Sequence, residues 1–144
     1  WPPMAKRTRR DSRHRSWVVA TRGGKQSHVG SLAWSLNIPE AGYYYVWGRI
    51  KAPSRDSDSF YIRISERQGQ GGEDPKTYAL GTWVTGKMTT WEWVPMDLTH
   101  LRAHREPTPI YLPRGDDLKF QIYARERGAM IDGLFITQDR SQRP

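Results

Sequence analysis

The chain has 144 residues, of which 36% are hydrophobic, 12% aromatic and 26% charged, and its formal net charge is +8. This length suits one domain, and seven Trp and seven Tyr supply too much apolar area for a fully disordered chain. No run of about 18 apolar residues is present, so we expect no membrane-spanning helix and no membrane partner. The absence of cysteine excludes disulfide scaffolds, thiolate metal sites and cysteine nucleophiles.

Much of the positive charge lies in residues 6–15, which hold six Lys or Arg and one Asp. Such an arm could bind the phosphate or sulfate groups of nucleic acid or another polyanion. It contains no aromatic residue for base stacking, so we favour a solvated N-terminal segment and do not expect nucleic acid as a partner. The sequence therefore divides into a basic arm, a domain and a C-terminal linker stub, at residues 1–15, 16–138 and 139–144.

Alternation of apolar with polar residues, rich in β-branched and aromatic types, runs along most of the chain between Gly and Pro residues. It predicts nine short strands: Ser16–Thr21, Ser31–Ile38, Tyr43–Lys51, Ser59–Ser65, Thr77–Trp83, Thr90–Asp97, Ile110–Leu112, Leu118–Glu126 and Met130–Thr137. Short strands at this spacing favour an all-β fold, a two-sheet antiparallel β-sandwich, over β-α-β units. Only Leu98–Arg105, after the potential N-cap Asp97, could form a helical turn; we expect His100 and His104 there to be solvated rather than metal ligands.

Three of these strands carry aliphatic residues on one face and aromatic residues mixed with Arg on the other. An ordinary solvent-facing side would carry Thr, Ser, Lys and Glu instead. If the three strands are neighbours, their second faces form one aromatic, cationic platform that comprises Tyr45, Trp47, Arg49, Tyr61, Arg63, Tyr123 and Arg125. Two alternatives stay open: a loop or another domain could cover Trp47, and Arg49 could form an ion pair across strands.

The remaining tryptophans divide between core and binding roles. Trp83 precedes a loop-like stretch, which makes it a candidate binding residue at a loop end. Trp91 could either stack on a ligand or fill the core, whereas we favour the core for Trp93. Trp34 alternates with Leu32 and Leu36, so we expect it in the core.

Several motifs occur in a fixed order between Ser16 and Thr137. They are Pro39–Arg49 (PEAGYYYVWGR), Ala52-Pro53, Asp58-Ser59-Phe60, Trp91-Glu92-Trp93, Leu112–Gly115 (LPRG) and Arg125–Thr137. In this order they resemble carbohydrate-binding modules of the family 6 and family 35 type. The resemblance implies a galactose-binding-like β-jelly roll, appended without catalytic activity of its own to a secreted polysaccharide-degrading enzyme.

The resemblance also implies a cofactor and a location. Asp132 matches the late Asp that commonly helps to hold a structural calcium ion in this family, whose first strand supplies acidic partners; the N-terminus here offers only Asp11. Calcium takes about six to eight oxygen ligands. Asp58 stands where the family often has Asn. We expect a secreted or cell-surface bacterial protein, and the start at Trp1-Pro2-Pro3, without an initiator Met, indicates a piece of a longer chain.

The platform suits a sugar polymer, because Trp and Tyr rings stack on the C–H face of a pyranose while charged donors bind its hydroxyls. Arg can also grip a uronate or sulfate with two hydrogen bonds, so we prefer an anionic polysaccharide. The alternatives are a polysaccharide lyase-like jelly roll, faintly suggested by Gln121-Ile122-Tyr123, a polyanion or nucleic-acid binder that uses the basic arm, and a structural module without a ligand. No pair of carboxylates is placed convincingly for glycoside hydrolysis.

Overall fold

Nine strands make up the part of the chain that the computed structural model describes, namely residues 16–26, 31–55, 58–67, 71–99, 105–124 and 129–144. They are β1 (Ser16–Gln26), β2 (Ser31–Ile38), β3 (Gly42–Ala52), β4 (Ser59–Glu66), β5 (Thr77–Val84), β6 (Met88–Pro95), β7 (Ile110–Leu112), β8 (Gly115–Ala124) and β9 (Met130–Thr137). All nine predicted strands are present. No helix within these ranges is long and apolar enough to cross a membrane.

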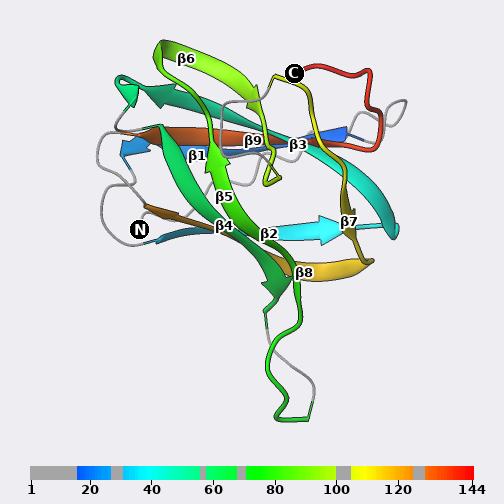
Figure 1. Cartoon of the computed structure of the whole chain (residues 1–144). Coiled ribbons are helices and arrows are strands. Elements are labelled where there is room, and N and C mark those ends of the chain that lie inside the picture. Colours follow the sequence, from blue (N-terminus) through cyan, green and yellow to red (C-terminus); the bar gives the residue numbers. More distant parts are fainter. Residues whose placement is uncertain (1–15, 27–30, 56–57, 68–70, 100–104, 125–128) are drawn as a thin grey trace.

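The strands form two antiparallel sheets that pack against each other (Figure 1). Sheet A has the order β1-β9-β3-β6, and the short β7 pairs with the beginning of β3. Sheet B has the order β2-β8-β4-β5. The predicted two-sheet β-sandwich is therefore confirmed. One consequence matters for the site: β3 belongs to sheet A, whereas β4 and β8 are neighbours in sheet B.

The core lies between the sheets and is built from the faces that alternation predicts. Its largest contributors from the three strands considered above are all buried: Tyr44, Val46, Ile50, Phe60, Ile62, Ile64, Leu118, Phe120 and Ile122. Trp34 is fully buried, as predicted, and its ring meets Phe120 edge-on at 5.9 Å between centroids. The sequence pattern thus identified the inner face of each of these strands correctly.

Trp83 connects the two sheets. It belongs to β5 in sheet B, and its indole Nε1 donates a hydrogen bond of 3.1 Å to the carbonyl oxygen of Pro95, at the end of β6 in sheet A. A Cβ atom at Gly48 on β3 would lie only 2.4 Å from Trp83 Cη2, so the backbone of sheet A must pass the ring without a side chain. The expectation that Trp83 stands open at a loop end is wrong, because none of its surface is exposed.

Two local predictions need correction. β1 does not end before Gly23-Gly24 but continues to Gln26. Its pairing with β9 shifts register between Ala20 and Lys25, so the residues between these two positions are accommodated as an irregularity within the strand. Asp97 accepts hydrogen bonds from the backbone N and the hydroxyl of Thr99, at 2.8 Å and 2.6 Å, in a bend rather than at the start of a helix. Residues 100–104, which include both predicted histidines, lie outside the described residues.

The β4–β5 hairpin projects beyond the body of the sandwich (Figure 1). Its base is closed by Glu66, whose backbone N donates to the carbonyl oxygen of Lys76 at 2.9 Å. The Glu66 carboxylate accepts hydrogen bonds from the backbone N of Lys76, at 3.2 Å, and from the hydroxyl of Tyr78, at 2.9 Å. These two donors hold the pKa of Glu66 below its usual value, while burial and the facing carboxylate raise the pKa of Tyr78.

We expect Gly48→Ala to lower the free energy of unfolding by about 1–3 kcal/mol, because the new methyl group would overlap the fixed Trp83 ring. Urea unfolding followed by circular dichroism measures this loss. Gly115→Ala is the matched control, since a Cβ there would meet Leu118 at an ordinary contact distance of 3.4 Å. Equal losses in the two variants would contradict the role assigned to the Gly48–Trp83 contact.

Candidate functional site

The predicted aromatic platform is divided between two faces of the molecule. Tyr45, Trp47 and Arg49 lie on the outer face of sheet A, because they alternate with buried residues of β3. Tyr61, Arg63 and Tyr123 lie together on the outer face of sheet B. The single platform was wrong because alternation assigns a residue to a face of its own strand but does not say which sheet the strand joins. Arg125 lies outside the described residues.

On sheet A, Trp47 is covered by the chain itself. Only 6% of its surface is exposed, and the guanidinium of Arg143 lies over its ring, 5.0 Å from the centroid. Arg143 also pairs with Glu106 at 3.6 Å, and the hydroxyl of Thr137 donates to the side-chain oxygen of Gln142 at 2.9 Å. The predicted linker stub therefore packs back onto sheet A, and Trp47 offers no open ring face for stacking.

Arg49 forms the ion pair across strands that was the alternative to ligand binding. Its Nη1 lies 2.5 Å from Oδ2 of Asp132 on β9, and its guanidinium lies over the ring of Trp91 at 5.3 Å. Burial raises the pKa of Asp132, and the charge of Arg49 and its hydrogen bond only partly oppose this effect. Arg49 is therefore already engaged with a carboxylate and an indole.

The calcium ion that the family resemblance implies stays a prediction, because its expected N-terminal acidic partner, Asp11, lies outside the described residues. The described residues contain no group of three or more His, Cys, Asp or Glu side chains that could hold a metal. The carboxylate of Asp132 faces the cationic Arg49 instead of other acidic groups. Glu126 also lies outside the described residues.

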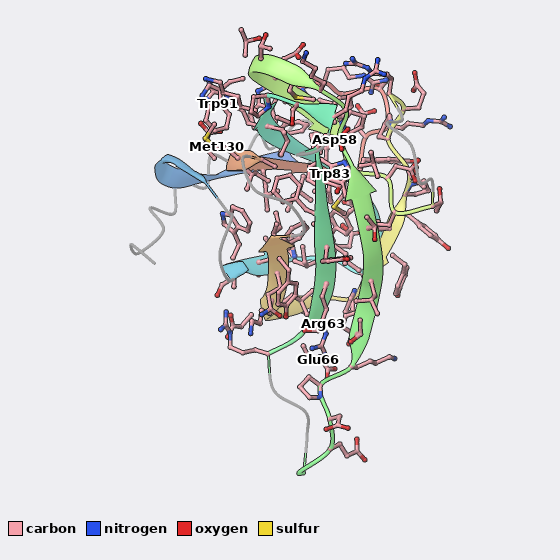
Figure 2. The ribbon with its side chains drawn as sticks, turned by 60° about the vertical axis from the view of Figure 1, so that its left-hand side comes forward. Asp58, Arg63, Glu66, Trp83, Trp91 and Met130 are labelled. Carbon is pink, nitrogen blue, oxygen red and sulfur yellow. The ribbon has the colours of Figure 1, made fainter. Side chains whose placement is uncertain are left out.

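The two tryptophans of β6 also lie on the outer side of sheet A. Trp91 is half-buried beside Arg49, and Figure 2 shows it near Met130 of β9. Trp93 is the register partner of Arg49 and is half-buried, with its ring edge-on to Phe135 at 6.3 Å. The expectation of a core position for Trp93 is thus wrong: it packs on the outer face of the sheet, because it shares the side of Arg49.

The outer face of sheet B is where the remaining candidates meet. Tyr61 of β4 is the register partner of Tyr123 of β8, and Arg63 is the partner of Gln121 in the next outward row. Lys119 follows in the row beyond. We call these five residues, Tyr61, Arg63, Lys119, Gln121 and Tyr123, the β4–β8 surface. Tyr61 is 46% exposed, and the other four are partly exposed.

The cations of the β4–β8 surface are not neutralised by nearby acids in the part of the chain that the structure describes. Arg63 has one hydrogen-bond partner there, the hydroxyl of Thr77, at 3.2 Å from its Nε, and no carboxylate. Glu66 lies further along the same strand (Figure 2), but its carboxylate is occupied by Lys76 and Tyr78. Arg63 therefore keeps most of its donors available to a ligand.

One end of the β4–β8 surface is closed by Arg67. Its guanidinium pairs with Asp117 at 2.7 Å and donates to the hydroxyl of Ser35 on β2 at 2.5 Å, so it reaches across the strand order of sheet B. On the β5 side, Leu80 is 73% exposed and is the register partner of Arg63. Leu80 is not among the predicted site residues. Gly81 and the buried Trp83 share the inward side of β5, so the alternation indicates that Leu80 points outward.

Comparison with solved structures finds relatives in fold. The C-terminal family 6 carbohydrate-binding module of LamC, a marine laminarinase from Zobellia galactanivorans, superposes with a TM-score of 0.51 over 85% of this chain and 80% of that one, at 19% identity. The chain shares its fold with this carbohydrate-binding module. A β-glucosidase from Paenibacillus barengoltzii gives a TM-score of 0.50 at 14% identity, over 84% of this chain and 10% of the enzyme.

A family 35 module from Clostridium thermocellum also appears, with a TM-score of 0.47 and 14% identity over 84% of this chain and 90% of that one. No family model matches the sequence, and no curated protein matches it significantly. The resemblance seen in the sequence motifs thus agrees with the fold of a carbohydrate-binding module. Identities this low establish the fold alone, so the function has to be argued from this chain's own side chains.

We expect Arg49→Met to destabilise the protein by about 1–3 kcal/mol at pH 7, because it leaves the Asp132 carboxylate without its charged partner. The folded-state pKa of Asp132 lies above its ordinary value, so folding favours the protonated carboxyl. The stability that this protonation contributes is complete at low pH and is lost as the pH rises through the folded-state pKa. Loss of Arg49 raises this pKa further, and the deficit should shrink as the pH falls and Asp132 becomes protonated.

Urea unfolding of the wild type and Arg49→Met between pH 3 and pH 7 measures the deficit. Arg49→Met combined with Asp132→Asn is the matched control, because it removes the charge that Arg49 balances and should recover most of the stability at pH 7. A deficit that does not change with pH, and that the second substitution does not relieve, would contradict this account.

Proposed function

We propose that this protein is a non-catalytic carbohydrate-binding module that binds a polysaccharide through the β4–β8 surface. The observation that carries the proposal is the pairing of two tyrosines across adjacent strands, with an arginine and a glutamine as the next pair on the same outward face. Tyr61 and Tyr123 provide aromatic rings, while Arg63 and Gln121 provide hydrogen-bonding groups beside them. The fold shared with carbohydrate-binding modules supports the same conclusion.

The surface matches the chemistry of a pyranose. The C–H face of the sugar ring stacks on Tyr61 or Tyr123, because an aromatic ring removes it from water without demanding hydrogen bonds. The hydroxyl rim of the sugar then lies within reach of Gln121, whose amide both donates and accepts. Because the outward rows repeat along the strands about every 7 Å, a sugar chain that lies along them can contact more than one row.

The preferred ligand is an anionic polymer such as alginate, a pectic uronate, ulvan or a sulfated glycan. Arg63 can hold a carboxylate or sulfate with two parallel hydrogen bonds, and Lys119 adds a second positive charge in the next row. In the described part of the chain neither cation has a carboxylate partner that a ligand would have to displace. Arg67, at one end of this surface, and Arg49, on sheet A, are both ion-paired and contribute less to this preference.

As part of a longer protein, the module would hold an attached polysaccharide-active domain close to its substrate. Binding of the module converts encounters of that domain with the polymer into nearly intramolecular ones, which raises the effective concentration of substrate. This role places the protein outside a bacterial cell or on its surface, where polysaccharides are met.

We expect Tyr61→Ala and Arg63→Met each to weaken binding to an anionic polysaccharide at least about tenfold, equivalent to about 1.4 kcal/mol. Affinity gel electrophoresis against alginate, polygalacturonate, xylan and a neutral β-glucan measures the retardation. Arg55→Met and Thr89→Ala are the matched controls, since both residues are exposed and lie outside the β4–β8 surface. Retardation only by xylan or the β-glucan would contradict the anionic preference, and no retardation by any glycan would contradict the module role.

The same assay distinguishes the other functional classes. A polyanion binder that uses the basic arm would keep its affinity in Tyr61→Ala and lose it when residues 6–15 are deleted, whereas the module should show the reverse. A polysaccharide lyase would create unsaturated chain ends in the polymer during the assay, detectable by their ultraviolet absorbance. The proposed module should create none.

A further inference from the structure

The four strands that end the two sheets differ in how their free edges are protected. An open edge presents unpaired N–H and C=O groups to which another chain can add a strand, and proteins block it with charged residues, proline or a covering group. β1 carries Lys25, and β6 carries Glu92 and ends at Pro95. The guanidinium of Arg67 bonds Ser35 on β2. The remaining edge strand, β5, has the sequence TYALGTWV, which contains no charged residue and no proline.

The register of the β4–β5 ladder shows which backbone groups of β5 are free. The backbone N of Thr85 donates to the carbonyl oxygen of Asp58 at 2.7 Å, which makes these two residues a hydrogen-bonded pair. Such pairs alternate along an antiparallel ladder, so every second residue from Thr85 backwards bonds β4, and the residues between them direct their N–H and C=O groups away from it. These outward residues are Leu80, Thr82 and Val84. Within the described part of the chain their main-chain groups have no hydrogen-bond partner on that side.

The side chains along this edge are uncharged and reach solvent. Leu80 is 73% exposed, the highest value among the large apolar side chains described, and Thr82 and Val84 are partly exposed. Beneath the strand, Leu98 covers the inward side at Gly81, where a Cβ atom would lie 3.1 Å from Leu98 Cβ. The core is thus closed at this margin. What stays open is a line of main-chain donors and acceptors with an apolar side chain beside it.

We propose that β5 pairs with β5 of a second copy of this chain, antiparallel and centred on Thr82, so that two molecules form a dimer whose sheets B are continuous. The three outward residues are symmetric about Thr82: Leu80 lies opposite Val84 of the second copy, and the two Thr82 residues lie opposite each other. This register forms about six main-chain hydrogen bonds. It also joins two apolar side chains and pairs two threonines, both favourable cross-strand combinations. The two-fold axis closes the assembly at two copies.

A second copy suits this edge better than a strand of another protein, because the edge is complementary to itself. The nearest cations, Lys76 and Lys87, fall opposite Met88 and Thr77 of the second copy, so no like charges meet. The contact is small, and the net charge of +8 on each chain opposes association. We therefore expect a weak dimer, with a dissociation constant on the order of 100 µM, that tightens as the salt concentration rises.

The dimer has a consequence for the β4–β8 surface. The row of Tyr123, Tyr61 and Thr82 continues through Thr82 of the second copy, so both β4–β8 surfaces lie on one face. Three strand spacings separate the two Tyr61 residues, about 14 Å. The dimer itself does not depend on the proposed function, but this consequence does: if the ligand is a glycan, one polymer segment laid across the strands meets both surfaces.

Because the chain contains no cysteine, single-cysteine variants can test the register directly. In the proposed dimer the Cα atoms of the two Thr82 residues lie about 5.5 Å apart, whereas those of the two Leu80 residues lie about 13 Å apart. We expect dibromobimane, a short cross-linker that fluoresces on joining two thiols, to link Thr82→Cys at least about tenfold faster than Leu80→Cys. Leu80→Cys is the matched control, because Leu80 lies on the same strand and is more exposed, so random collisions would favour it.

Sedimentation equilibrium from about 10 µM to about 1 mM measures the dissociation constant. Thr82→Pro should weaken the dimer at least about tenfold, because it removes an outward N–H group and leaves the hydrogen bonds to β4 in place. Thr82→Val keeps that N–H group and should stay within about threefold of the wild type. Leu80→Lys, which leaves the backbone unchanged, should also weaken the dimer. Circular dichroism verifies that each variant is folded.

The outcomes separate the dimer from the proposed function. A wild type that stays monomeric up to about 1 mM, or cross-linking no faster at position 82 than at position 80, would overturn the β5 dimer. So would a dimer that both Thr82→Pro and Leu80→Lys leave intact. Cross-linked Thr82→Cys should be retarded by alginate at least about fivefold more strongly than the same variant with its thiol blocked. Equal retardation would overturn the shared face and leave the dimer, and no glycan binding by the wild type would overturn the proposed function alone.

Discussion

The contact between Trp83 and the backbone of sheet A constrains the rest of the sandwich. An indole from sheet B reaches across the core, donates its only hydrogen bond to the carbonyl of Pro95 and fits against Gly48. The ring is rigid and lies directly against the Gly48 backbone, with no side chain between them that could adjust. The spacing and relative position of the two sheets are therefore fixed at this point. The outward rows of both sheets are set by the same arrangement, so the candidate binding surfaces depend on a residue that no ligand touches.

The fold sorts the arginines into two kinds. On sheet A, Arg49 and Arg143 are held by carboxylates and lie over tryptophan rings, where they stabilise the surface. On sheet B, Arg63 has a single threonine as its partner among the described residues and stands beside two tyrosines. The same residue types, Arg next to an aromatic ring, thus serve as structural clamps on one face and as a candidate sugar contact on the other. Composition alone does not distinguish these uses.

Local patterns predicted the strands and their inward faces, because alternation and turn residues act over a few positions. They failed where distant segments decide the outcome. Whether β3 lies beside β4 depends on the order of strands in space, and Asp132 meets Arg49 across 83 positions of sequence. Trp83 was misplaced because its neighbour across the core, Gly48, is in another strand. A glycine in an otherwise bulky inward row of β3 was the available signal for a large ring opposite.

The segment after β9 was expected to be a linker, yet Arg143 and Gln142 tie it to the outer side of sheet A. It therefore covers Trp47, whose ring would otherwise add to the solvent-facing surface. A domain boundary drawn at residue 138 would cut this cover away. The shorter fragment would retain every strand of the sandwich but expose the Trp47 ring. Its solubility would therefore differ from that of the longer chain, although its fold would not.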